Sequence, residues 1–163
     1  KMKYNDQINV LKTIPGLSDA TFARLGGIHR NTYINSPNIL NNDLTLLSNN
    51  KIRFAGQITG VEGYVESTAI GFLSAIFLIM KLSNKEIKLP PTTTAMGSLL
   101  RYITRKDGFD NFQPMNINFG LFDEIIFKKN TKKPKRELKK YKKEMISKRS
   151  LGDFKAWHQS IYV

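Results

Sequence analysis

Residues 53–71 read RFAGQITGVEGYVESTAIG, and this stretch decides the fold that the sequence predicts. The preceding residues 51–55 (KIRFA) have the composition of a β-strand and lead into a turn. Three glycines follow, Gly56, Gly60 and Gly63, and glycine lets a ligand approach the backbone closely. From Val61 the pattern becomes helical, so unpaired N–H groups at the helix start would favour an electron-rich or anionic group. A strand, a glycine-rich turn and a helix in this order indicate an α/β domain that holds a cofactor.

The glycine spacing, G-x-x-x-G-x-x-G, differs from the G-x-G-x-x-G fingerprint of dinucleotide-binding turns. Three further motifs accompany it: HRNTYINSP at residues 29–37, PPTTTAMGSLLRYIT at 90–104 and FQPMNINFGLF at 112–122. Together with GQITGVEGYVES at 56–67, they resemble the folate- and flavin-dependent tRNA (uracil-5-)-methyltransferases, in the same order along the chain. These enzymes are similar to glutathione-reductase-like flavoproteins, in which a late glycine motif and helix contact the flavin.

The resemblance covers nearly the whole chain but only about the carboxyl-terminal third of the family's length. It implies the last part of an α/β, glutathione-reductase-like FAD-binding fold, with a few strands, a long buried helix and a basic helical end. Residues 1–50 would close an inserted or substrate-side subdomain, 51–105 would complete the FAD-binding domain, and 106–163 would form a loop and basic helices. The ADP site and the reactive cysteines of the family would lie in a missing amino-terminal part, which becomes an expected partner. Because the chain has no cysteine, we assign no catalytic residue to it, and we assign no metal ligand.

The resemblance assigns the glycine motif to FAD. Gln57 stands where related flavoproteins carry an acidic residue for the ribityl chain, and an amide can donate and accept there. The N–H groups of residues 59–63 would face the N1–C2 edge of the flavin, where negative charge develops on reduction. The predicted cofactor-binding residues are Gly56, Gln57, Ile58, Thr59, Gly60, Val61, Glu62 and Gly63.

A folate pocket is the second site that the resemblance implies. In an extended strand, His29, Asn31 and Tyr33 would share one face, with Arg30 on the other, and such a face suits a pterin ring. The alternative is a polar strand face that is satisfied internally. Asn116 and Asn118 would also point the same way, either toward the pterin or toward the backbone of their own loop.

Charge is concentrated near the carboxyl end of the chain. Residues 128–149 hold 12 basic and two acidic side chains, which leaves +10 of the total net charge of +13. The alternative without a binding role is a solvated helix face. Apolar residues recur here at three- and four-residue steps, however, so the segment should form a helix that packs against the protein and holds its lysines in fixed positions. Pro134 would start this helix, and Ser150 with Asp153 would begin a second, short one. The predicted RNA-binding residues are Lys132, Lys133, Lys135, Arg136, Lys139, Lys140 and Lys143.

The longest apolar run, residues 69–80, has 12 residues and is shorter than the roughly 18 that a membrane span needs. We therefore expect a helix buried on all sides and no membrane partner. The other expected elements are a helix at 5–14, strands at 21–25 and 28–35, a short strand near 45–47, and a helix at 94–104 whose Leu99, Leu100 and Ile103 face inward. Phe119, Phe122 and Phe127 are expected in the core.

The expected function is that of a portion of an enzyme that makes 5-methyluridine in the T loop of tRNA. The resemblance implies 5,10-methylenetetrahydrofolate as the one-carbon donor, FAD as its carrier and reductant, NAD(P)H as the electron source and a cytoplasmic location. Three alternatives stay open: a wobble-uridine tRNA-modifying flavoprotein, the same chemistry on ribosomal RNA, and a non-enzymatic RNA-binding module.

Overall fold

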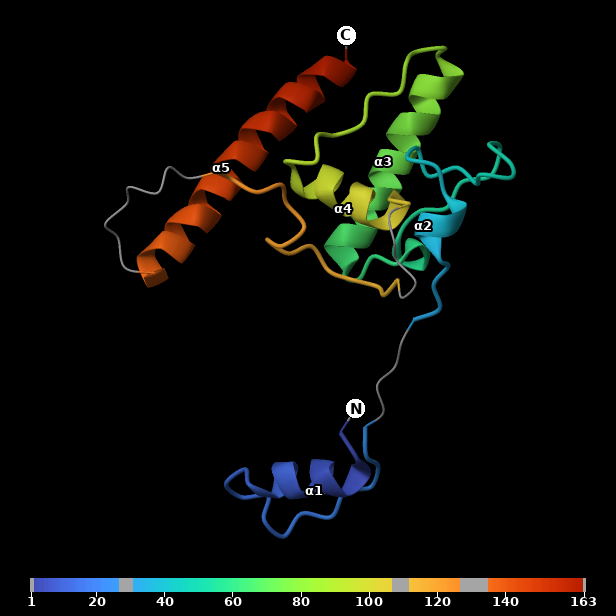
Figure 1. Ribbon diagram of the computed structural model, residues 1–163. Helices are drawn as coiled ribbons and strands as arrows, with labels where there is room; N and C mark the ends of the chain where they lie inside the picture. The colour runs from blue at the N-terminus through green and yellow to red at the C-terminus, as the bar shows by residue number, and fades with distance from the viewer. Residues whose placement is uncertain (1, 27–30, 107–111, 127–134, 163) are drawn as a thin grey trace. The chain divides into compact units, whose positions relative to one another are not determined.

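The structure is a computed structural model that describes residues 2–26, 31–106, 112–126 and 135–162. The chain forms two compact units, residues 1–31 and 32–163 (Figure 1). The first unit holds α1, Tyr4–Lys12, close to the helix predicted at 5–14. Within it, the Gln7 side chain donates to the Gly26 carbonyl over 3.1 Å and ties the following loop back to the helix. The predicted division into 1–50, 51–105 and 106–163 concerns the family-length protein and stays a prediction.

The second unit is built from helices. Its elements are α2 (Ser36–Ile39), the 3₁₀ turn η1 (Gln57–Thr59), α3 (Tyr64–Leu82), α4 (Ala95–Thr104) and α5 (Lys135–Ile161). Both α2 and α3 pack against α4. The core between them contains Leu40, Leu44, Val61, Ile70, Leu73, Phe77, Leu99, Leu100, Tyr102, Ile103, Phe112 and Trp157.

The predicted strands do not form among the described residues. Pairing there is limited to isolated bridges, Leu40 with Leu46 and Thr45 with Arg53 antiparallel, and Val61 with Met115 parallel. The predictions at 21–25, 45–47 and 51–55 are therefore wrong as strands, and so is the described part of 28–35; residues 28–30 lie outside the described residues. A strand needs a neighbouring strand to bond its backbone groups, and single bridges do not supply a sheet. The α/β class is not confirmed.

Helix α3 differs from the prediction at its start and on its surface. It begins at Tyr64 rather than Val61, because η1 and the positive φ angles of Gly60 (+87°) and Gly63 (+94°) keep the preceding residues out of the helix. One side is buried, and its members are Ile70, Leu73, Ser74, Phe77 and Met80, while most of the opposite side is exposed. A helix buried on all sides was therefore wrong for this chain.

The length argument against a membrane span was wrong as well, because α3 has 19 residues. By length and composition alone it could cross a membrane, with 28% of its most apolar 18-residue window buried. Buried core helices meet the same criterion, so this observation by itself does not assign a membrane.

Helix α4 confirms the sequence-based expectation closely. The Thr94 hydroxyl accepts from the Gly97 N–H over 3.0 Å and caps the first turn. Leu99, Leu100 and Ile103 are buried, as their spacing predicted. Gly97 allows the Pro90–Pro91 segment to cross the helix directly, because a Cβ at this position would lie 2.0 Å from the Pro91 carbonyl oxygen.

Helix α5 is one continuous helix, so the predicted second helix at Ser150–Asp153 is wrong; Pro134 lies outside the described residues. The carboxylate of Asp153 accepts from the Thr93 hydroxyl instead of capping a new helix. Arg149 donates to the carbonyl groups of Asp123 and Glu124. These tertiary contacts hold α5 against the rest of the second unit on both sides of Gly152.

The far end of α5 is held by Trp157, which is buried and donates its indole N–H to the Lys88 carbonyl over 2.9 Å. Near the middle of α5, Arg149 contacts the backbone of Asp123. The carboxylate of Asp123 accepts hydrogen bonds from Thr92 and Arg101, and these bonds lower its pKa below the ordinary value.

Phe119 is 43% exposed, so its assignment to the core was wrong. It stacks on Phe122 with ring centroids 5.9 Å apart, where Lys143 covers it from α5.

The crossing at Gly97 predicts the effect of one added methyl group. Gly97→Ala should lower the free energy of unfolding by about 1–3 kcal/mol, because its Cβ meets rigid backbone. The matched control is Gly71→Ala in α3, whose Cβ meets nothing within 4 Å and which should raise stability by about 0.5–1 kcal/mol. Urea unfolding followed by circular dichroism measures both. Equal stabilities of the two variants would contradict this packing.

Candidate functional site

The glycine loop, residues 56–63, is a rigid turn held by its own backbone. The Thr59 hydroxyl donates to the Gly56 carbonyl over 2.7 Å, and the Gly60 N–H donates to the Gln57 carbonyl over 3.0 Å. From α2, the Ser36 hydroxyl donates to the Thr59 carbonyl over 2.8 Å. The loop is therefore preformed by protein contacts.

A second segment, residues 112–118, pairs with the loop. The Met115 N–H donates to the Gly60 carbonyl over 3.1 Å, and the Glu62 N–H donates to the Met115 carbonyl over 3.0 Å. These two bonds form the parallel bridge of Val61 with Met115. Two motifs that are 52 residues apart at Gly60 and Phe112 thus meet in space, and Met115 is a residue that sequence reasoning did not single out.

On its Cβ side, Gly60 makes room for a side chain of the protein, and its predicted contact with a ligand stays a prediction. A Cβ on Gly60 would lie 2.3 Å from Cζ of Phe112. The Phe112 ring is buried and packs against Tyr33 and Tyr102, at centroid distances of 6.0 Å and 5.5 Å. The residues on either side of Gly60, Thr59 and Val61, are fully buried as well.

Gly63 is also crowded, by polar side chains. A Cβ on Gly63 would lie 2.2 Å from Oε2 of Glu66 and 2.8 Å from Nδ2 of Asn116. The Glu66 carboxylate accepts from the Ile117 N–H over 3.2 Å, and Asn116 donates to the Glu62 carbonyl over 3.0 Å. Glu66 therefore helps to hold the 112–118 segment against the start of α3. Gly56 differs, since its Cβ would make an ordinary contact at 3.7 Å with the Ser67 carbonyl oxygen.

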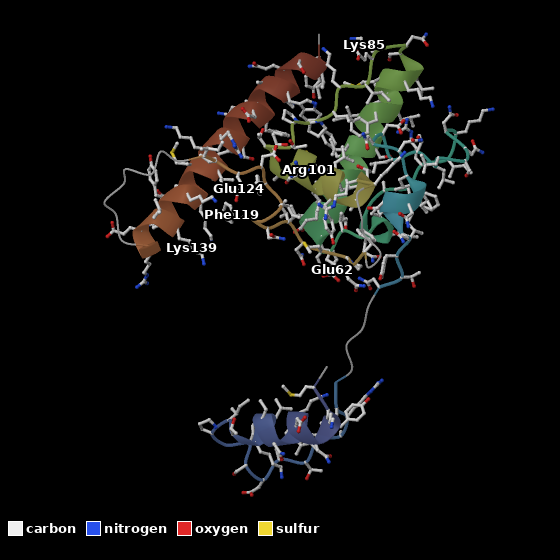
Figure 2. The ribbon with its side chains drawn as sticks, in the orientation of Figure 1. Glu62, Lys85, Arg101, Phe119, Glu124 and Lys139 are labelled. Carbon is white, nitrogen blue, oxygen red and sulfur yellow. The ribbon has the colours of Figure 1, made fainter. Side chains whose placement is uncertain are left out.

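The start of α3 is the open part of this region. Gly63 is the N-cap and supplies no side-chain cap, and the next two residues, Tyr64 and Val65, are 95% and 80% exposed. The first-turn N–H groups of a helix have no acceptor within it. The predicted donors at Thr59, Gly60 and Glu62 instead bond inside the protein, so the available donors belong to the first turn of α3. Glu62, labelled in Figure 2, is exposed beside this turn.

An apolar groove of about 460 Å³ adjoins this helix start, and it is lined by Tyr64, Val65, Thr68, Ala69, Phe72 and Met96. A more enclosed cavity of about 580 Å³ lies elsewhere, among Asn41, Asn42, Arg101, Arg105 and Lys106. It contains none of the predicted site residues, and Arg101 already pairs with Asp123 there. The described ranges hold no group of three His, Asp or Glu side chains that could bind a metal ion.

Three of the predicted folate residues, Tyr33, Asn116 and Asn118, lie in the second unit, and Asn31 is the last residue of the first. His29 and Arg30 lie outside the described residues, so the folate site stays a prediction. The Tyr33 hydroxyl donates to the Phe112 carbonyl over 3.5 Å. Asn118 bonds within its own loop, accepting from the Gly120 N–H over 2.9 Å.

The predicted RNA-binding residues lie partly on the first half of α5. Arg136, Lys139, Lys140 and Lys143 are exposed, and Figure 2 shows Lys139 on this part of the helix. Lys140 lies 4.0 Å from Glu144, and Lys143 lies 5.1 Å from the Phe119 ring centroid. Lys132 and Lys133 lie outside the described residues, and Lys135 begins the helix.

Comparison with known proteins connects this geometry to a family. The chain is 49% identical to methylenetetrahydrofolate–tRNA-(uracil-5-)-methyltransferase TrmFO of Rhizobium etli, over 96% of this chain and 36% of that protein. It is 48% identical to the protein of the same name from Bartonella bacilliformis, over 96% and 36%, and 45% identical to that of Syntrophotalea carbinolica, over 99% and 33%. The chain thus spans about a third of the length of these curated relatives.

The matched family is described as Glucose inhibited division protein A, and its match covers residues 1–86. The match includes the glycine loop and the whole of α3 and ends before α4. Since it takes in more than half of the 163 residues, the chain belongs to the Glucose inhibited division protein A family.

Proposed function

We propose that this chain is the carboxyl-terminal portion of a folate- and FAD-dependent tRNA (uracil-5-)-methyltransferase. The observation that carries the proposal is 49% identity over nearly the whole chain to a relative of that name. The family-length enzyme would transfer a one-carbon unit from 5,10-methylenetetrahydrofolate to C5 of a uridine in the T loop and make 5-methyluridine. NAD(P)H as reductant and a cytoplasmic location are further parts of this proposal.

The role of this chain toward FAD is to present the start of α3. When bound, the flavin supplies the redox chemistry, and the protein supplies position and electrostatics. The uncapped first turn offers N–H donors and the positive end of the helix dipole. A helix start stabilises a nearby negative charge by about 0.3–2 kcal/mol. This amount tunes a reduced flavin but does not hold the whole cofactor, so most of the binding site belongs to the rest of the enzyme.

The roles of Gln57, Asn31, Tyr33 and Asn116 remain within this proposal. Gln57 is only partly buried, and its side chain donates to the Thr32 carbonyl over a long 3.4 Å, so a better acceptor could replace that contact. Tyr33 donates to the 112–118 segment at Phe112, and Asn116, a member of that segment, donates to the glycine loop at Glu62. A pterin beside them would therefore lie against a framework already fixed by hydrogen bonds.

The basic half of α5 suits the RNA backbone. Ile146 and Trp157 dock the helix through one face, while Lys139, Lys140 and Lys143 stay exposed on its first half. Docking fixes the charges, and fixed cations suit the phosphates of a structured RNA. A ribosomal RNA substrate and the wobble-uridine enzymes share this electrostatic requirement.

The non-enzymatic alternative, an RNA-binding module, is favoured by one observation. Phe112 fills the space at Gly60 that a ligand was expected to use. A module would need only the docked basic helix and would bind RNA without any flavin.

Flavin retention separates the enzyme from the module. A family-length protein that carries this segment should purify with FAD and shift its flavin absorption when a folate is added. The chain alone should lose FAD on gel filtration, because it spans about a third of its relatives' length and its sequence has no G-x-G-x-x-G turn for the ADP half of the cofactor. In the family-length protein, Gly63→Ala should lower FAD affinity by about tenfold through backbone strain at φ +94° and the clash with Glu66.

The control for that variant is Gly152→Ala on α5, where a Cβ meets nothing within 4 Å and FAD content should not change. Stoichiometric FAD retained by the chain alone would contradict the division of the cofactor site. A colourless family-length protein that still bound tRNA would favour the module.

Salt dependence tests the RNA-binding role of α5. Replacing Lys139 and Lys140 by glutamine should weaken tRNA binding and make the slope of log affinity against log salt shallower by up to about one unit per lost phosphate contact. The control with the same loss of charge is Lys12→Gln with Lys51→Gln, at two exposed positions that do not belong to α5. Filter binding at several salt concentrations measures both. Equal slopes for the two double variants would show that the lysines of α5 form a solvated helix face and make no phosphate contacts.

A further inference from the structure

Helix α3 carries a second apolar face, opposite the one that packs in the core. We call it the outer stripe, and it consists of the exposed residues Tyr64, Val65, Thr68, Phe72, Ala75, Leu78, Ile79 and Leu82. These residues recur at three- and four-residue steps, which places them on one side of the helix. Val65, Ile79 and Leu82 are 80%, 63% and 75% exposed. The stripe therefore runs along the full 19-residue helix.

The outer stripe has no charge along its length. The charged residues of α3 are Glu66 and Lys81, and both are engaged elsewhere. Glu66 accepts from the Ile117 N–H, and Lys81 donates to the Asn50 carbonyl over 3.1 Å. A helix at a water-facing surface normally presents polar residues on its outer side, whereas a helix that is apolar all round is a buried one. A contiguous apolar surface of this kind marks an interaction site.

The small residues of α3 would let a partner approach its backbone closely. A Cβ on Gly71 would meet nothing within 4 Å, and Ala75 follows one turn later. At the amino end of the helix the surface deepens into the groove of about 460 Å³ that Phe72 and Met96 line. The surface thus offers both a flat strip and a recess, as a packed interface requires.

We propose that the outer stripe is an internal interface that packs against the remainder of the family chain. By the remainder we mean the part of the relatives' length that this chain does not span, about two thirds of each. Two observations favour this occupant. The family match at residues 1–86 includes all of α3, so the stripe belongs to the region that defines the family. The extended segments of the second unit form only isolated bridges among the described residues, so they too lack the neighbours that a sheet would provide.

Other occupants fit the contacts less well. Lipid around a spanning α3 would require its inner face to leave the core, although Ile70, Leu73 and Phe77 are fully buried there. A second copy of the chain could cover the stripe, and the experiment below separates this outcome. The inference rests on membership of the family and does not depend on the methyltransferase reaction.

The test uses co-expression of this chain with the remainder of the Rhizobium etli relative. The two should co-purify and sediment as a 1:1 complex. Phe72→Glu with Ile79→Glu should weaken the complex by at least about tenfold, because two charges would enter an apolar interface. The matched control is Ile126→Glu with Leu151→Glu, which changes two exposed apolar residues, 95% and 61% exposed, outside the stripe. The control should bind like the unaltered chain.

A second measurement covers the case in which the charged variant misfolds. Because the sequence has no cysteine, single variants Ile79→Cys and Leu151→Cys can be labelled with a maleimide. The remainder should slow labelling at residue 79 by at least about tenfold and leave residue 151 unchanged. Peptide mass spectrometry reports each position separately from the cysteines of the remainder.

Four outcomes would overturn the proposal. These are no complex with the remainder, a homodimer of the chain that protects residue 79, transfer of the chain to phosphatidylcholine–phosphatidylglycerol vesicles, and equal weakening by the control variant. Complex formation and maleimide labelling are read out without reference to FAD, folate or tRNA. If the co-expressed complex forms through the stripe but purifies without FAD, only the proposed function is defeated.

Discussion

The contact between Gly60 and the ring of Phe112 is the constraint on which the glycine loop depends. The ring lies where a Cβ of residue 60 would be, so this position requires glycine for packing as well as for its φ of +87°. The parallel bridge of Val61 with Met115 then aligns the two segments, and Glu66 with Asn116 fixes the last turn before α3. The glycine loop consequently acts as a support that sets where α3 begins and which way its first turn faces.

This arrangement divides the surface of α3 into parts with different tasks. The inner face closes the core with α4, and the first turn remains uncapped. The basic helix α5 is tied to the same body through Trp157 and through the polar contacts of Arg149 and Asp153. One folded unit thus carries both an uncapped helix start and a cationic helix, although the curated relatives are about three times longer than this chain.

Local signals in the sequence predicted local structure well. Helix α4 was predictable because Thr94 caps it and its apolar residues follow the helical period, and α3 and α5 were predictable as helices for the same periodic reason. The strands were not, because a strand is stabilised by partners far away in the sequence, and the described residues supply isolated bridges only. Ser150 and Asp153 had the spacing of a capping box, but the carboxylate of Asp153 is used by Thr93, 60 residues away. Likewise, nothing near Gly60 indicated that Phe112 would fill its space.

A double-mutant cycle of Gly60→Ala and Phe112→Ala tests this account most directly. Urea unfolding of the two single variants and the double variant gives the coupling free energy between the two positions. The account predicts that Gly60→Ala costs less stability when Phe112 is already alanine, with a coupling of about 0.5–3 kcal/mol. Additive effects within about 0.3–0.5 kcal/mol would contradict it.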